Sequence, residues 1–260
     1  MSVKLFFHFL KIIMRTRMEY RADFLLGMVG QILGYAANYL IVWLLLNRFT
    51  TIEGWAWPEM AFLISINVLT YAIGASFTYT PMLSLEQLII KGDLDKYLIK
   101  PINPFSYLLA SFFNFGYIAH ILISAALLIW SLGNLSVQWG IFESIYFLFT
   151  LLSGSMLQAG GLILIGSWSL YFMKSQFMGD LYFKIKDVIN YPLSAYTAVI
   201  QVVLTWMMPL AFINYFPALY LLQKEENSAL LLVPIVGPLF LMLTIFIWHR
   251  GIHKYQGAGS

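Results

Sequence analysis

The sequence contains no cysteine among its 260 residues, and only 10% of its residues are charged. The first absence excludes disulfides, thiolate nucleophiles and cysteine metal ligands. The second is unusual for a soluble protein, in which about a quarter of the residues are charged. Sixty per cent of the residues are hydrophobic, more than a core of this size can hide. The excess must face lipid, so we expect an integral membrane protein and exclude a soluble enzyme, a nucleic-acid-binding protein and a disordered chain.

Motifs for covalent chemistry are also absent. The sequence has no G-x-x-x-x-G-K-[ST] phosphate loop, no H-E-x-x-H and no G-x-S-x-G. Its four histidines are far apart, and none has a carboxylate at the spacing of a metal site. We therefore expect a chain that is not an enzyme, with no catalytic residues, no metal site and no cofactor of its own.

Six stretches are long and apolar enough to cross a bilayer, which takes roughly 20 residues. The expected spans of this all-α membrane domain are residues 24–47, 59–79, 105–132, 144–172, 188–208 and 229–248. Residues 209–223 are apolar but too short to cross, and they contain Pro209 and Pro217, while Pro192 interrupts the fifth expected span. Because proline breaks or kinks helices, we interpret 209–223 as a re-entrant segment in the outer leaflet.

The distribution of basic residues favours this topology. With six spans and the N-terminus inside, thirteen of the 15 Lys and Arg residues lie on the inner side, and only Arg48 and Lys224 lie outside. Cytosolic loops carry an excess of positive charge. A seventh span would place Arg250 and Lys254 outside. We therefore expect a multi-pass protein of the cell (cytoplasmic) membrane with both termini in the cytosol.

Residues 1–22 are predicted to form an interfacial helix. Lys4, His8, Lys11 and Arg15 share one stripe of a helical wheel, and apolar residues cover the rest. No small-residue cleavage site follows, so the segment is not a signal peptide. The pattern is typical of a helix that lies in the inner membrane surface. The alternative is an ordinary cytosolic flank that happens to be helical.

None of the expected spans carries an Asp, Glu, Lys or Arg at its centre. Such residues mark ion paths and proton relays. His120 has no ionisable neighbour in sequence, so we expect a structural hydrogen-bonding role, with a proton carrier as the alternative. Gly30 and Gly34 form a G-x-x-x-G motif, for which packing inside the chain is favoured over a subunit interface.

The inner loop 80–104 has the signals of two short amphipathic helices. Ser84 followed by Gln87 matches a capping box, and Gly92 is a normal helix stop. The aspartates after Gly92 can cap a second helix, which ends before Pro101. We expect this structured loop to dock against a partner. The alternative is that it lies on the membrane or on the inner face of its own chain.

The sequence G-D-L-D-K-Y-L-I-K-P-I-N-P, from Gly92 to Pro104, resembles the signature loop of a six-span bacterial ABC-2-class transporter permease family. Further similarities lie after the fifth expected span and at the tail: Tyr191 to Leu193, Pro209 to Phe212, Tyr215 to Ala218, and Gly251 to Tyr255 followed by Gly257 and Gly259. Ile252 and His253 are mild departures from the family pattern. The resemblance covers essentially the whole chain, and the inner loop is its most specific part.

The resemblance implies the membrane-spanning permease subunit of an ATP-driven ABC exporter. ATP and Mg²⁺ would belong to a separate ATP-binding cassette subunit, and a second permease subunit, a copy or a homologous chain, would pair with this one in the lipid bilayer. The loop 80–104 would be the coupling loop that inserts into the ATP-binding subunit. The residues expected to contact that partner are Glu86, Lys91, Gly92, Asp93, Leu94, Asp95, Lys96, Leu98 and Pro101.

The uncharged spans suit a hydrophobic or amphipathic cargo such as a drug, a lipid-like molecule or a peptide. A second function stays open, because a non-transporting membrane anchor or sensor could recruit a cytosolic protein through the same loop. ATP-dependent movement of a cargo separates the two. A channel is disfavoured, since the sequence has no ring of charge and no filter-like segment.

Overall fold

The computed structural model describes residues 3–49, 51–172 and 175–255, and over these ranges its regular elements are helices, apart from one isolated bridge between Ile52 and Trp55. The all-α prediction is confirmed. Lys174, Gly257 and Gly259 lie outside the described residues. Five helical stretches are long and apolar enough to cross a membrane: Arg21–Leu44, Trp57–Ile90, Phe115–Asn134, Ile141–Phe172 and Ser228–Lys254.

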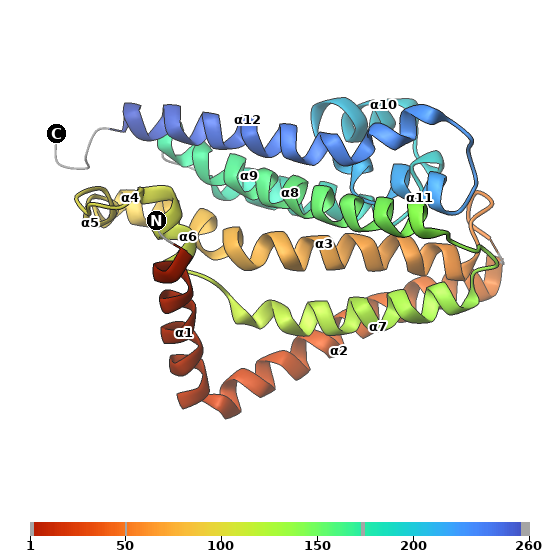
Figure 1. The fold of residues 1–260 in the computed structure, drawn as a ribbon, viewed down its shortest axis with the longest axis horizontal. Helices are drawn as coiled ribbons and strands as arrows, with labels where there is room; N and C mark the ends of the chain where they lie inside the picture. Colours follow the sequence, from red (N-terminus) through yellow and green to blue (C-terminus); the bar gives the residue numbers. More distant parts are fainter. Residues whose placement is uncertain (1–2, 50, 173–174, 256–260) are drawn as a thin grey trace.

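The helix α8 (Ile141–Phe172) lies at the centre of the bundle and packs along α3 (Trp57–Leu83) and α12 (Val233–Lys254) (Figure 1). Small residues make this close approach possible. A Cβ atom added to Gly74 of α3 would lie 2.5 Å from the carbonyl oxygen of Ser155, and one added to Gly237 of α12 would overlap the backbone of Ser153. The small residues of the fourth expected span therefore serve packing within the chain.

Replacing Gly237 with alanine should lower stability, because the added methyl group meets the rigid backbone of α8 and not a movable side chain. Overpacking of this kind costs about 1–3 kcal/mol. Thermal unfolding of the purified protein in detergent measures the effect. The control is Gly133→Ala in α7 (Ile118–Asn134), where the new methyl group has no atom within 4 Å. Equal unfolding temperatures of the two variants would contradict the proposed contact.

The glycines of the helix α2 (Arg21–Phe49) do not pack against another helix within the described residues, although the sequence had led us to expect such packing. Within the described chain, a Cβ atom added to Gly27, Gly30 or Gly34 has nothing within 4 Å. The preference for packing inside the chain was therefore wrong for this motif. The helix instead contacts the bundle through aromatic side chains. The ring centres of Tyr35 and His120 are 4.6 Å apart, and Tyr39 is buried.

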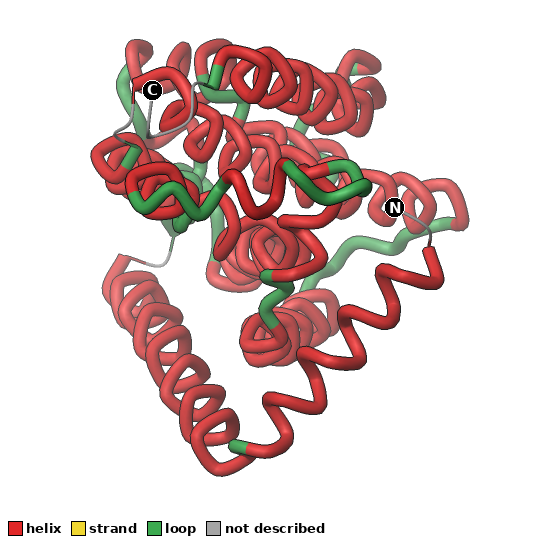
Figure 2. The backbone as a smooth tube through the Cα atoms, turned by 90° about the vertical axis from the view of Figure 1, so that its left-hand side faces the viewer, coloured by secondary structure: helices red, strands yellow, loops and turns green. Residues whose placement is uncertain are grey.

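The helix α1 (Val3–Glu19) runs across the end of the bundle and meets α2 in a V (Figures 1 and 2). Lys4, His8, Lys11 and Arg15 are all exposed. On the opposite face, Phe9 packs 5.5 Å from the ring of Tyr107. The predicted amphipathic helix is thus present, while its place in the membrane surface stays a prediction.

The third expected span, 105–132, is not one helix. A short helix α6 (Pro104–Ser111) is followed by a break, and α7 begins only after the turn Phe115–Tyr117. Asn114 causes the break, because its side chain accepts a hydrogen bond from the backbone N–H of Gly116 at 2.9 Å and its own N–H donates to the carbonyl of Ser76. Asparagine competes in this way with helical hydrogen bonds.

The fifth expected span, 188–208, consists of short pieces and is not one helix. The chain first forms α9 (Gln176–Val188), within the stretch that its charges had assigned to an inner loop. Pro192, which is buried, then interrupts the helix. Short pieces follow: Leu193–Ala195, α10 (Ala198–Val202) and a π-helical turn, Val203–Met207. The charges of α9 favoured an aqueous loop, and Asp180, Lys184 and Asp187 are indeed exposed, but the side of the helix that carries Gly179, Tyr182 and Lys186 is buried against the bundle.

Residues 209–223 form the turn Leu210–Phe212 and the helix α11 (Tyr215–Leu221). Pro209 directly precedes the turn. Pro217 is tolerated in the first turn of α11, because a backbone N–H at that position has no partner within the helix. The stretch Leu210–Leu221 is bent by 77° relative to Ala198–Met207. This pair counts as a sixth span or as a re-entrant loop, so the predicted dip into the outer leaflet stays a prediction. The turn Ser228–Leu232 leads into α12.

Candidate functional site

The inner loop contains the two short helices that the sequence predicts, α4 (Leu85–Ile90) and α5 (Asp95–Leu98). They lie at the end of the bundle that also carries α1 and the C-terminal end of α12 (Figure 1). Gly92 sits between them with a φ of +70°, a left-handed conformation that glycine adopts without strain. The chain reverses there, and the backbone N–H of Leu94 donates to the carbonyl of Leu88 at 3.1 Å.

The caps of these helices differ from the prediction. The Ser84 hydroxyl donates to the carbonyls of Thr80 and Pro81, so it does not form the capping box expected from the sequence. No side chain caps α5 either. The carboxylate of Asp93 instead forms an ion pair with Lys96, whose hydrogen bond and positive charge hold the pKa of Asp93 below its ordinary value.

Apolar side chains fix the loop to the bundle. Leu85, Ile89 and Leu94 are buried in the same cluster as Met82 and Trp248. Leu94 was expected to contact a partner, but it has no exposed surface and acts as an anchor. Leu98 is half-buried against the same cluster. The loop is therefore a rigid extension of the bundle, and its interior is formed by residues that a partner cannot reach.

The outer side of the loop carries an apolar surface with a charged rim. Ile99 is 82% exposed and Ile90 is 55% exposed, although both are large hydrophobic residues in a polar loop. We call the exposed residues of this surface the docking face: Ile90, Lys91, Asp95, Lys96, Ile99, Lys100 and Pro101. Apolar residues surrounded by polar ones are typical of protein interfaces. Ile90 and Ile99 were missed from the sequence, although their position off the buried stripe was a usable signal.

Glu86 points away from the docking face and caps α9. Its Oε2 atom accepts hydrogen bonds from the backbone N–H of Ser175 at 2.6 Å, from the Ser175 hydroxyl at 3.1 Å and from the N–H of Gln176 at 3.1 Å. A carboxylate at this position satisfies free N–H groups and complements the positive end of the helix dipole. Glu86, expected to bind a partner, therefore joins the loop to α9.

From this cap, α9 runs into the bundle beside α8, where a chain of hydrogen bonds holds it. The Tyr182 hydroxyl donates to the side-chain oxygen of Gln158 at 2.8 Å. The amide of Gln158 donates to Asn67 at 3.0 Å, and that of Asn67 donates to Asn190 at 2.8 Å. Gln158 and Asn67 are fully buried. The network connects α9 to α3 and α8, so the three helices are positioned together.

The last turn of α9 places a buried lysine and an exposed aspartate beside α3. Lys186 lies with its Nζ atom 3.3 Å from the carboxylate of Asp187 and 4.7 Å from the centre of the Tyr71 ring. Tyr71 is about 18 Å along α3 from Leu83, at about 1.5 Å per residue. The expected spans themselves carry no charge at their centres, but Lys186, which belongs to none of them, lies beside the middle of α3. Sequence reasoning missed these residues because it assigned them to an aqueous loop.

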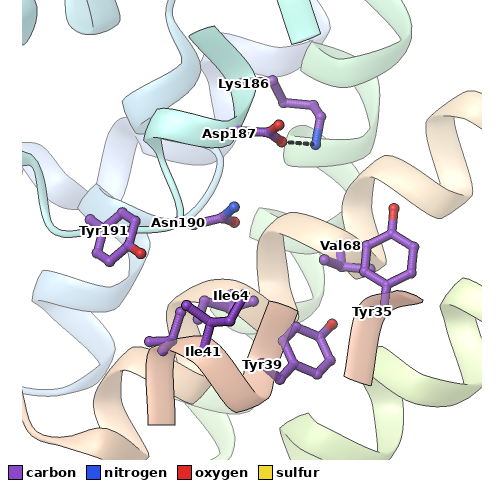
Figure 3. A pocket seen from close by; sticks show the side chains of 10 residues that line it. Tyr35, Tyr39, Ile41, Ile64, Val68, Lys186, Asp187, Asn190 and Tyr191 are labelled. Carbon is purple, nitrogen blue, oxygen red and sulfur yellow. Dashed lines mark ion pairs between the residues drawn. The ribbon is translucent and has the colours of Figure 1, made fainter. Parts of the chain in front are cut away.

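Lys186 and Asp187 line a cavity of about 370 Å³ between α2, α3 and α9 (Figure 3). Small-molecule sites in proteins have volumes of about 300–1,000 Å³. The polar lining consists of Tyr35, Tyr39, Lys186, Asp187, Asn190 and Tyr191. Over the described ranges, the chain brings together no group of three or more His, Cys, Asp or Glu residues that could hold a metal ion.

Comparisons with known proteins agree with this architecture. A family model described as ABC-2 family transporter protein matches residues 32–259, which include the loop, α9 and the cavity. No curated protein and no solved structure gives a significant match. Because the family match extends over most of a chain with several apolar membrane-spanning helices, the protein belongs to the ABC-2 family of transporter proteins.

Proposed function

We propose that the chain exports a hydrophobic or amphipathic cargo across the cell membrane, driven by a separate ATP-binding cassette subunit that binds the docking face. Membership of the family makes the chain a membrane permease of an ABC transporter. The direction of transport, the cargo class and the ATP-binding partner belong to the proposal. A second permease subunit, identical or homologous, also belongs to the proposal, and the open space beside Gly27 and Gly30 of α2 is compatible with such pairing.

One observation carries the proposal, namely the continuous connection from the loop to the cavity. The docking face is rigidly attached to α4, Glu86 of α4 caps α9, and the far end of α9 lines the cavity. With 13 residues, α9 is about 20 Å long. A movement imposed on the loop by ATP binding or hydrolysis would therefore move α9 together with α3 and α8, and would shift Lys186 and Asp187 against α2. Rigid-body shifts of helices are a common way to couple distant sites.

The experiment that tests this proposal measures transport directly. The permease and its ATP-binding subunit are produced together, and inside-out vesicles are supplied with an amphipathic fluorescent dye. We expect ATP-dependent accumulation of the dye inside the vesicles, which is lost when the partner carries a hydrolysis-deficient substitution. A non-transporting anchor or sensor would bind the same partner but would move no dye, and that result would contradict the proposal.

A further inference from the structure

The two charges of the cavity are unequally accessible. The side chain of Lys186 is 10% exposed, because Asp187 and the Tyr71 ring cover its ammonium group. The side chain of Asp187 is 70% exposed and lines the cavity. A carboxylate offers about four lone-pair sites, so one lysine does not saturate it. The charge that the cavity presents to a ligand is therefore negative.

The other residues that line the cavity form a polar side and an apolar side, which suit the two ends of an amphipathic molecule. The hydroxyl of Tyr39 is buried without a hydrogen-bond partner among the described residues, and Asn190 adds an amide beside Asp187 (Figure 3). Tyrosine rings also attract cations through their faces. The opposite wall is hydrocarbon, formed by Ile41, Val42, Ile64 and Val68.

We propose that this cavity binds an amphipathic cation, with a protonated amine at Asp187 and an apolar body against the wall formed by α2 and α3. The inference rests on the proposed function, since it names the chemical class of the cargo. Neutral and anionic molecules are disfavoured, because a neutral group adds no charged contact to the exposed side of the carboxylate and an anion is repelled by it. Lys186 holds the carboxylate in place and exposes only 10% of its own side chain.

The binding experiment compares three probes that share one fluorophore. Dansylcadaverine carries a protonated primary amine at neutral pH, its N-acetyl derivative is neutral, and dansyl-6-aminohexanoic acid is an anion. Each is titrated against the permease with its ATP-binding subunit in lipid nanodiscs without nucleotide. A charge-assisted contact corresponds to about a 10-fold difference in affinity. We expect the cation to bind at least about 10-fold more tightly than the other two probes.

Two substitutions shift this preference in opposite directions. Asp187→Asn should reduce the advantage of the cation to within about two-fold, and Lys186→Gln should increase it, because the carboxylate loses its competing partner. The control is Asp180→Asn on the same helix, which removes a carboxylate from a different cavity and should leave the preference unchanged. Asp187→Asn leaves Lys186 buried without its counter-ion, which is costly. If that variant does not fold, the inference is tested by Lys186→Gln alone, which should increase the preference for the cation.

Equal affinity for the cation and its acetylated form, tighter binding of the anion, or a preference that both substitutions leave unchanged would overturn the inference. Its failure is distinguishable from that of the proposed function because nucleotide is absent from the titration. Charge-selective binding without ATP-driven dye accumulation would contradict export alone. Transport by a permease whose cavity shows no charge preference would contradict the cavity assignment alone.

Discussion

Replacing Ile99 with aspartate should weaken the complex between the permease and its ATP-binding subunit at least 30-fold, roughly the effect of losing 2 kcal/mol at an interface hot spot. Ile99 is the most exposed large hydrophobic residue of the loop, at 82%. A charge there would be buried without a partner when the subunits meet. The affinity can be measured by titrating the purified ATP-binding subunit onto nanodiscs that contain the permease.

The control for this variant is Ile99→Leu, which keeps an apolar side chain and should bind like the wild type. Neither substitution should alter the fold, since the Ile99 side chain packs against little of the chain. Undiminished affinity of both Ile99→Asp and Ile90→Asp would show that the docking face is not where the ATP-binding subunit docks. The loop would then only cover the end of the bundle, which was the alternative left open by its amphipathic sequence.

Replacing Glu86 with alanine should uncouple ATP hydrolysis from transport. The substitution removes three hydrogen bonds that join α4 to the first turn of α9, while the docking face is untouched. Loss of such a cap costs about 0.5–2 kcal/mol. We expect ATP turnover by the complex to remain within about two-fold of the wild type and dye transport to fall about 10-fold, since each 1.4 kcal/mol of coupling corresponds to a factor of ten.

The matched control is Glu143→Ala. Glu143 also accepts a hydrogen bond from a backbone N–H at the start of a helix, that of Gly140 at 2.8 Å. It belongs to the first turn of α8, and α8 begins at the end of the bundle opposite α4 (Figure 1). The Glu143→Ala variant should lose a similar amount of stability and should keep its transport activity. A Glu86→Ala variant with normal transport would contradict transmission through α9. If turnover and transport fell together, Glu86 would instead be needed for assembly with the partner.

The hydrophobic pattern was sufficient to predict the long helices, and turn chemistry at Gly92 was sufficient to predict the two loop helices. The failures involve contacts between residues that are distant in sequence. Asn67 and Asn190 are separated by 123 positions, and Glu86 and Ser175 by 89. No local pattern shows that these side chains meet. Sequence reasoning therefore treated all the charges of α9 as solvated, whereas Lys186 is buried and pairs with Asp187.

The candidate site was predicted in part for a similar reason. The resemblance directed attention to the conspicuous residues of the G-D-L-D segment, of which Leu94 is a buried anchor and Asp93 pairs with Lys96. Which residues of a short helix face outward depends on how the helix rests on the bundle. The loop alone does not contain that information, so the exposure of Ile99 became evident only from the packing of Leu85, Ile89 and Leu94.

The central claim is that a cytosolic ATP-binding subunit grips the docking face, and the absence of cysteine from the natural sequence allows a direct test. A single cysteine is introduced by Ile99→Cys, and inside-out vesicles are treated with a membrane-impermeant maleimide, with and without the ATP-binding subunit. We predict rapid labelling of the free permease and at least about 10-fold slower labelling of the complex, because the interface excludes the reagent. Labelling from the outside of intact cells, or a rate that the partner does not change, would contradict the account.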